Sequence, residues 1–190
     1  MINIEIWASG GGSNADKILT YFKNNPIIEV VSLGCNRSKA GAFNVAHKHQ
    51  IKSILWDKKS WETSNIIHGL KERSVDFIVL AGFLKLVPKE IIEHYKGRIV
   101  NIHPSLLPKY GGKNMYGNHV HEAIIDDKEK KSGITIHEVN EEFDKGKILA
   151  QFSVNLDIND DVKSLRKKIQ YLEHQHYSSI IHSWIKSKSQ

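Results

Sequence analysis

Cysteine, proline and long apolar runs are scarce in this 190-residue chain, and each scarcity excludes a class of protein. Cys35 is the single cysteine, so no intrachain disulfide and no cysteine-based metal site can form. With 4 prolines and 13 glycines, the composition is that of neither a collagen nor a long disordered segment. The longest apolar run, Phe77 to Phe83, is too short to cross a bilayer, and the N-terminus lacks the basic region of a signal peptide. We therefore expect a soluble cytoplasmic protein without a membrane partner.

Charge and histidine content leave several classes of ligand open. Lys and Arg outnumber Asp and Glu by 27 to 21, which gives a net charge of +6. The basic residues are spread along the chain, without zinc-finger spacing, an RNA-binding aromatic motif or an arginine-rich arm. We therefore expect no nucleic-acid partner and favour an anionic small molecule. Several of the 11 histidines come in pairs spaced by one residue, which places them on opposite sides of a helix, so we also expect no metal.

The first half of the chain alternates apolar runs with amphipathic stretches. The run Asp76 to Ala81 shows no polar alternation, which is typical of a parallel strand buried on both faces. This alternation predicts an α/β fold with a doubly wound, mostly parallel, Rossmann-like sheet flanked by helices. The expected strands here are Ile2 to Ala8, Ile27 to Cys35, Ser53 to Trp56, Asp76 to Ala81 and Arg98 to Ile102, and the expected helices are Ser13 to Lys23, Ala40 to His49, Ser60 to Arg73 and one between Pro88 and Gly97.

The second half changes character. After a glycine-rich loop over Pro108 to Asn118 we expect a helix over His119 to Asp126. Two antiparallel strands, Gly133 to Val139 and Ile148 to Val154, and a long C-terminal helix capped by Asp160 or Asp161 follow. No repeat or linker separates the halves, so we predict a single domain, 1–190. Within it, residues 1–105 form a phosphate-binding half, and residues 106–190 form a half for the second substrate and catalysis.

The first strand runs into a glycine-rich turn, Ser9-Gly10-Gly11-Gly12-Ser13-Asn14, which opens the first helix. Glycines allow the backbone to approach a ligand closely, and the free N–H groups of a helix N-terminus attract anions. We therefore expect this turn to bind a phosphate group. The stretch also fits the dinucleotide-binding pattern G-x-G-x-x-A. The second strand ends in Asn36-Arg37, without the acidic residue that holds the ribose of NAD, whereas Arg37 could favour the phosphorylated cofactor. An NADP-binding protein therefore stays an alternative.

A second candidate site is Asn101-Ile102-His103-Pro104, at the end of a buried strand. Residues two apart on a strand point to the same side, so the amide and the imidazole share a face. This pair suits addition to a carbonyl, with an amide donor beside an acid–base group. Asp144, in the Asp-Lys-Gly turn that follows a later strand, could reach His103 or could serve only the turn.

Together these segments resemble the folate-dependent phosphoribosylglycinamide formyltransferase family. The resemblance runs from residue 2 to about residue 184 and is strongest in Asn101-Ile102-His103-Pro104-Ser105-Leu106-Leu107-Pro108-Lys109-Tyr110. It also includes Ile134-Thr135-Ile136-His137 and Asp144-Lys145-Gly146. It implies transfer of the formyl group of 10-formyltetrahydrofolate, a co-substrate, to the amine of 5'-phosphoribosylglycinamide (GAR) in purine (IMP) biosynthesis. The oligomeric state that we expect from this resemblance is a monomer or a homodimer.

The resemblance also implies roles for individual residues. Asn101, His103 and Asp144 match the catalytic residues, with Asn101 and a protonated His103 donating to the oxyanion while Asp144 raises the pKa of His103 and holds a water. The residues matched to GAR binding are Gly11, Gly12, Ser13, Asn14, Gln170 and Glu173. Those matched to the folate are Lys59, Leu84, Lys85, Leu86, Val87, Asn101 and His137.

The sequence departs from the family at several places, among them the loop after Tyr110, which lacks the proline that relatives often have there. Lys85 stands where many relatives have Arg, which replaces a planar guanidinium by a point charge. The helix after the glycine-rich loop has Val120 where relatives usually have a histidine, so we assign His119 and His121 no role. A formyltransferase for another amine, such as a nucleotide-linked amino sugar, remains an alternative that would keep Asn101, His103 and Asp144.

Overall fold

In the computed structural model, which describes residues 1–57 and 61–189, the chain forms two compact units. The first comprises Met1–Val100 and the second Asn101–Gln190, and strand β5 (Ile99–His103) crosses the boundary. The count of one domain, with halves meeting at residue 105, stays a prediction. Across the described part of the chain, no helix is both long enough and apolar enough to span a membrane.

The first unit contains a parallel sheet. Its strands are β1 (Ile2–Ala8), β2 (Ile28–Cys35), β3 (Lys52–Leu55) and β4 (Phe77–Leu80), in the order β3-β2-β1-β4. Each of the three neighbouring pairs is parallel. All four residues of β4 are buried, as its unbroken apolar sequence predicts.

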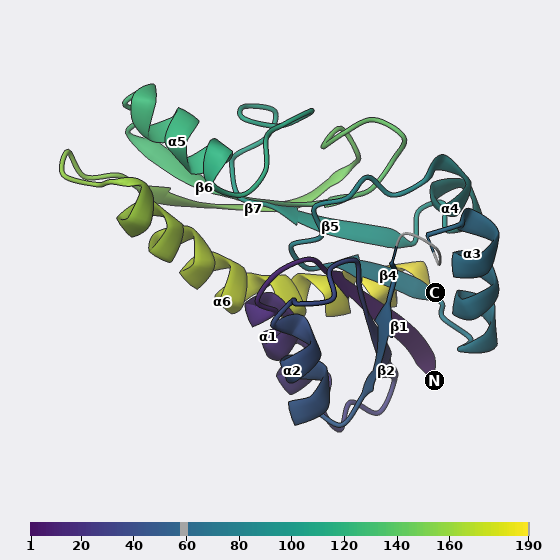
Figure 1. The fold of residues 1–190 in the computed structure, drawn as a ribbon. Coiled ribbons are helices and arrows are strands. Elements are labelled where there is room, and N and C mark those ends of the chain that lie inside the picture. The colour runs from purple at the N-terminus through teal and green to yellow at the C-terminus, as the bar shows by residue number, and fades with distance from the viewer. Residues whose placement is uncertain (58–60, 190) are drawn as a thin grey trace. The chain divides into compact units, whose positions relative to one another are not determined.

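Four helices accompany this sheet, namely α1 (Ser13–Phe22), α2 (Ala42–Lys48), α3 (Thr63–Glu72) and α4 (Lys89–His94). Figure 1 shows α1 and α2 on one side of the sheet and α3 and α4 on the other. The strand order therefore reverses between β1 and β4. In open α/β sheets, ligands bind beyond the carboxyl ends of the strands at such a switch point.

A buried carboxylate anchors the middle of this sheet. Glu5 in β1 is fully buried and forms an ion pair with Arg73 at 2.7 Å. It also accepts hydrogen bonds from the Trp7 indole (2.7 Å) and the Ser32 hydroxyl (2.5 Å). With three donors around it, this charge meets the condition under which a buried carboxylate is tolerated.

The second unit contains β6 (Lys131–Glu138) and β7 (Ile148–Asn155), which pair antiparallel, and the helices α5 (Asn118–Asp126) and α6 (Val162–Lys188). Helix α6 packs against both strands and against α5. Asp161 is its N-cap, in a reciprocal capping box with Ser164. The predicted α/β fold class, mostly parallel with antiparallel strands in the C-terminal half and a long last helix, is confirmed.

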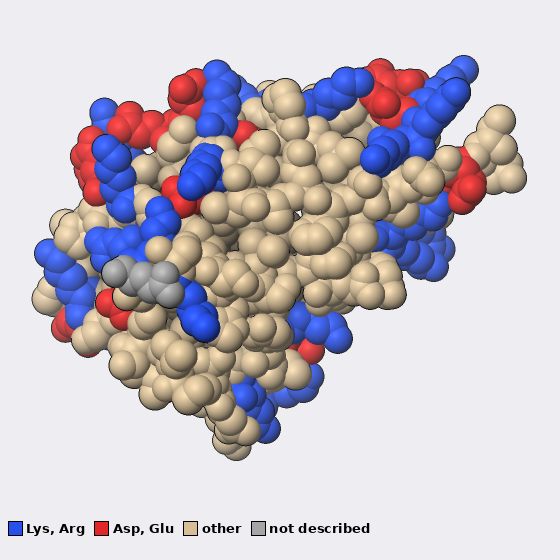
Figure 2. Space-filling model, turned by 180° about the vertical axis from the view of Figure 1, so that it is seen from behind, with Lys and Arg blue, Asp and Glu red and all other residues tan. Residues whose placement is uncertain are grey.

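Charged side chains do not form one continuous basic surface on the face seen in Figure 2. Lys and Arg appear there in several separate groups, many of them beside Asp or Glu. On this face the basic residues are therefore dispersed, as their spread along the sequence predicts.

Candidate active site

The loops that follow β1 and β4 are joined through one buried serine at the switch point of the first unit. The Ser9 N–H donates to the Gly82 carbonyl (3.1 Å), and its hydroxyl accepts from the Leu84 N–H (2.8 Å) while donating to Asn36 Oδ1 (2.7 Å). The glycine-rich turn and the segment starting at Leu84, assigned to phosphate and to folate respectively, therefore lie side by side at one sheet edge.

Gly12 shows why the turn is built of glycine. Its φ is 82°, in the left-handed region, and an added Cβ would lie 2.9 Å from the Cα of Ala42. Helix α1 starts at the next residue, Ser13, while Gly11 is exposed and Asn14 is 9% exposed. The turn therefore presents the N-terminus of α1 at the carboxyl end of β1, which is the geometry expected of an anion site.

The segment 84–87 offers apolar side chains to a ligand. Leu84 and Leu86 are 39% and 54% exposed, whereas Val87 is buried. Lys85 lies with its Nζ 3.8 Å from the centre of the Trp61 ring, which in turn stacks on Phe83. The two leucines therefore present apolar surface on this segment. Lys59, also assigned to the folate, lies outside the described residues.

Trp61 lies outside the helix that the sequence predicts over Ser60 to Arg73. The sequence placed it on a helix running from Ser60, but α3 begins at Thr63, and Trp61 precedes it. Its ring instead packs edge-on against Trp7 and stacks on Phe83. The half-buried Trp61 ring thus makes these aromatic contacts in place of the predicted first helical turn.

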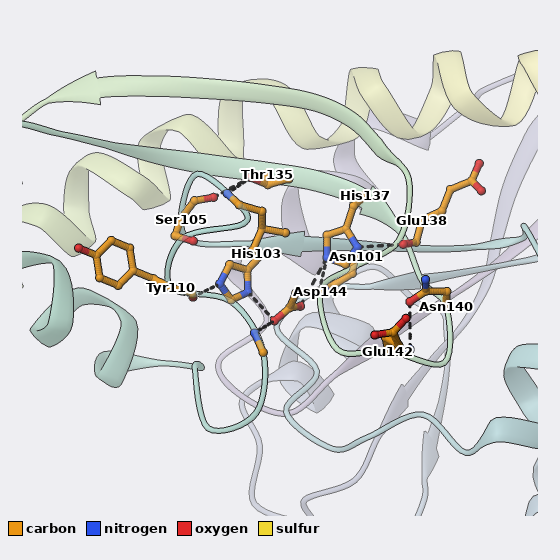
Figure 3. Close-up of polar contacts among 12 residues, drawn as sticks. Asn101, His103, Ser105, Tyr110, Thr135, His137, Glu138, Asn140, Glu142 and Asp144 are labelled. Atoms are coloured by element: carbon orange, nitrogen blue, oxygen red, sulfur yellow. Dashed lines mark hydrogen bonds and ion pairs between the residues drawn. The ribbon is translucent and has the colours of Figure 1, made fainter.

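In the second unit, the end of β5 brings Asn101 and His103 to one cluster, together with His137 and Asp144 (Figure 3). Asn101 Nδ2 lies 3.2 Å from His137 Nε2, and His137 Nδ1 lies 2.9 Å from the Glu138 carbonyl. Because a carbonyl only accepts, His137 Nδ1 carries a proton, and in the neutral ring Nε2 accepts from the Asn101 amide. One of the two Asn101 amide hydrogens is thereby engaged.

His103 is 4% exposed and has a polar partner at each ring nitrogen. Its Nε2 lies 2.7 Å from the Tyr110 carbonyl, and its Nδ1 lies 3.5 Å from Asp144 Oδ2. The prediction that Asp144 could reach His103 is thus met by the geometry. Its other carboxylate oxygen lies 3.6 Å from His137 Nε2, so this carboxylate faces both imidazoles.

The Asp-Lys-Gly turn explains how Asp144 is aimed at the cluster. Asp144 has a φ of 55°, in the left-handed region, and the Gly112 N–H donates to its Oδ2 at 2.9 Å. Gly146 packs so closely on the Glu138 carbonyl that any Cβ would overlap it. The turn is therefore held tightly against the end of β6, and both readings of Asp144, turn former and partner of His103, apply.

Burial governs the protonation of this cluster. It lowers the pKa of His103 below that of an ordinary histidine, although the Asp144 charge and the Tyr110 carbonyl act in the opposite direction. Burial alone would raise the pKa of Asp144, but contacts with His137, His103 and the Gly112 N–H outweigh it and lower that pKa. Burial therefore opposes the protonation of His103 that the sequence predicts, whereas Asp144 favours it.

Two remaining candidates lie on α6. Gln170 is exposed and Glu173 is half-buried, three residues further along the helix. Their assignment to GAR stays a prediction. Within residues 1–57 and 61–189, no group of three or more His, Cys, Asp or Glu side chains is arranged to hold a metal ion.

Sequence reasoning missed Tyr110 as a member of the cluster. Tyr110 reaches His103 through its backbone carbonyl, and every residue has a carbonyl, so no residue type marks the contact. The one available signal was its place in the segment that directly follows His103. His121 was also given no role, yet it lies buried in α5, and a positive charge on His103 lowers its pKa, after burial and Arg166.

The chain matches the family model described as formyl transferase over residues 2–181, and it belongs to that family. The phosphoribosylglycinamide formyltransferase of Bacillus subtilis (strain 168) is 34% identical over 187 residues, which cover 95% of this chain and 93% of that protein. The chloroplastic protein of the same name from Arabidopsis thaliana is 38% identical over 185 residues, or 94% of this chain. The chain spans 63% of that relative and 59% of the one from Vigna unguiculata.

A solved structure has the same fold along nearly the whole chain. The crystal structure of phosphoribosylglycinamide formyltransferase from Bacillus halodurans is 36% identical, with a TM-score of 0.88 over 99% of this chain and 97% of that chain. A second, glycinamide ribonucleotide transformylase 1 from Geobacillus kaustophilus, is 29% identical with a TM-score of 0.86, over 95% of this chain and 97% of that one.

Proposed function

We propose that this formyl transferase transfers the formyl group of 10-formyltetrahydrofolate to the amine of GAR, giving formyl-GAR and tetrahydrofolate, in purine (IMP) biosynthesis. The observation that carries the proposal is the buried cluster of Asn101, His103, His137 and Asp144. An amide donor, an imidazole and a carboxylate are what addition of an amine to a formyl group requires. Relatives of similar length bear the name of this activity.

Asn101 is the donor to the developing oxyanion. Its amide has two hydrogens, of which His137 engages one, and the side chain is partly exposed. The second hydrogen is thus available to a formyl oxygen. Removing one such donor typically costs about 3–4 kcal/mol of transition-state stabilisation.

His103 acts through charge, because its Nε2 hydrogen is engaged by the Tyr110 carbonyl. In the addition step, the amine nitrogen bonds to the formyl carbon and must lose a proton. That proton passes, by way of a water at Asp144, to His103 Nδ1, and the resulting imidazolium stabilises the oxyanion. When the bond between the formyl carbon and the folate N10 breaks, the proton goes to N10. Atoms and charges then balance, and no covalent enzyme intermediate forms.

The substrates are held by the segments that the family resemblance assigns. Gly11, Gly12, Ser13 and Asn14 bind the GAR phosphate at the N-terminus of α1, with Gln170 and Glu173 contacting the ribonucleotide. The pterin lies against the segment 84–87, where the exposed Leu84 and Leu86 supply apolar contact. Lys59, Lys85 and His137 complete the folate contacts. A cytoplasmic location, a monomer or homodimer, and the lack of a metal or nucleic-acid partner remain predictions.

The test is a formyl-transfer assay. Purified protein is mixed with 10-formyltetrahydrofolate, with and without GAR, while loss of the formyl group is followed optically. The Asp144→Asn variant, purified in the same way, controls for contaminating host enzyme. Release that requires GAR supports the proposal. Release without GAR indicates a hydrolase, whereas no release in either mixture directs attention to amino-sugar acceptors and NADPH binding.

A further inference from the structure

Tyr110 is connected to the catalytic cluster by its backbone and to a distant pair of carboxylates by its side chain. Its carbonyl lies 2.7 Å from His103 Nε2. Figure 3 shows its ring pointing away from His103. On that far side, its hydroxyl donates to Asp127 Oδ2 at 2.6 Å and lies 3.0 Å from Glu129 Oε1. The ring thus links the loop carrying the carbonyl to the end of α5.

The backbone at Tyr110 is in a conformation that needs such an anchor. Its φ is 57°, in the left-handed region that residues with a Cβ rarely adopt. Strained residues of this kind persist when surrounding contacts hold them, and they concentrate at functional sites. The hydroxyl contacts supply a restraint, and Lys109 reinforces it by pairing with Glu129 at 2.7 Å.

The segment that leads to Tyr110 is braced in the same way. The Ser105 hydroxyl donates to the Lys109 carbonyl, and Thr135 Oγ1 both donates to the Ser105 carbonyl and accepts from the Leu107 N–H. Two residues beyond Tyr110, the Gly112 N–H donates to Asp144. One short segment therefore contacts both His103 and Asp144, and the conformation at Tyr110 sets the direction of both contacts.

We propose that Tyr110 is a positioning residue for the formyl transfer: anchored on Asp127 and Glu129, it holds its carbonyl on His103 Nε2 and so fixes the proton there, leaving Nδ1 to exchange protons beside Asp144. The inference rests on the proposed function for its effect on turnover. The tautomer that it assigns to His103 is independent of any substrate.

The groups around His103 determine whether its pKa rises or falls when the Tyr110 carbonyl moves away. The titratable and charged groups facing it among the described residues are Asp144, His137 and His121. Of these, Asp144 stabilises an imidazolium and His137 opposes it, and the Tyr110 carbonyl adds to the stabilisation. When the carbonyl is released, the pKa of His103 falls further, and the ring is free to exchange between tautomers.

The experiment is histidine NMR on isotope-labelled protein, combined with kinetics. In the unaltered protein, we expect the His103 signals of the Nε2–H tautomer. Tyr110→Phe removes only the hydroxyl, and we expect mixed tautomers, a lower titration midpoint for His103, and a kcat reduced roughly ten- to hundredfold with smaller changes in both KM values. Tyr116→Phe is the matched control, since Tyr116 is an exposed tyrosine of the same loop whose ring packs edge-on against His119. It should change none of these quantities.

A second variant addresses the anchor from the other side. Asp127→Asn with Glu129→Gln keeps the phenol and the local shape but weakens its partners, and it should shift the His103 midpoint in the same direction. An Nδ1–H tautomer in the unaltered protein overturns the proposal without any variant. So does a Tyr110→Phe protein that melts normally and retains both the His103 midpoint and kcat. Failure of the proposed function looks different: the unaltered protein then transfers no formyl group, while the NMR result still decides the role of Tyr110.

Discussion

A buried histidine next to the catalytic cluster should make the protein lose stability in mild acid. His121 lies in α5, 5% exposed, and its Nδ1 has no hydrogen-bond partner among the described residues. Burial lowers its pKa to about 4, from 6.5 for an ordinary histidine, and the charges of Arg166 and His103 add to the effect. The folded protein therefore keeps His121 neutral where the unfolded chain protonates it.

The sign and size of the effect follow from proton linkage. Because the pKa of His121 is lower in the folded state, its protonation does not reduce the free energy of unfolding above about pH 6.5. As the pH falls from there toward 4, the unfolded chain takes up the proton first and the free energy of unfolding decreases. A difference of one in pKa corresponds to about 1.4 kcal/mol, so the full loss is about 3 kcal/mol. Between pH 7.5 and pH 5 the loss is about 2 kcal/mol, a substantial part of the 5–15 kcal/mol typical of a folded domain.

The perturbation is His121→Phe, which keeps a planar ring but cannot take up a proton. Urea unfolding of both proteins at several pH values gives two stability curves, and their difference cancels the titrating groups that they share. We expect the difference to grow in favour of His121→Phe by about 2 kcal/mol from pH 7.5 to pH 5. Parallel curves over this range would refute the reasoning, because His121 would then titrate alike in the folded and unfolded states.

The remaining predictions concern the site and the fold. Asp144→Asn should lower kcat by roughly 10²–10⁴-fold while changing both KM values little, and a near-normal kcat in steady-state assays would remove Asp144 from the chemistry. Ser13→Ala should raise the KM for GAR roughly tenfold and leave that for the folate unchanged, whereas equal weakening of both would contradict the phosphate assignment. Gly133→Ala would place a Cβ against the Phe152 carbonyl and should cost about 1–3 kcal/mol in thermal unfolding. Gly10→Ala, whose Cβ would meet nothing within 4 Å, is its control, and equal melting temperatures would refute the clash.

The fold was largely predictable because its signals are local. The unbroken apolar run of β4 and the glycine-rich turn after β1 specify a buried parallel strand and the start of a helix without knowledge of any partner. The same holds for the C-terminal helix, whose predicted cap at Asp160 or Asp161 is Asp161, in a capping box with Ser164. The ends of helices and strands were predicted less accurately. At Trp61, packing against the rings of Trp7 and Phe83 is found where the sequence predicts the first turn of α3.

The candidate site was predictable only in part, since side-chain chemistry is visible in a sequence and backbone contacts are not. The period of a strand placed Asn101 and His103 together, but nothing local showed that Asp144 comes within 3.5 Å of His103. Family resemblance supplied that partner. Neither source indicated the Tyr110 carbonyl or the low pKa of His103, because both depend on how the loop after β5 folds back and excludes water.

The central claim, that this chain moves a formyl group onto GAR, is tested most directly by identifying the product. Protein is incubated with GAR and 10-formyltetrahydrofolate carrying a labelled formyl carbon, and the products are separated and examined by mass spectrometry. We predict that the label appears on GAR as formyl-GAR, in step with formation of tetrahydrofolate, and far more slowly with Asp144→Asn. Label recovered as free formate, with GAR unchanged, would contradict it.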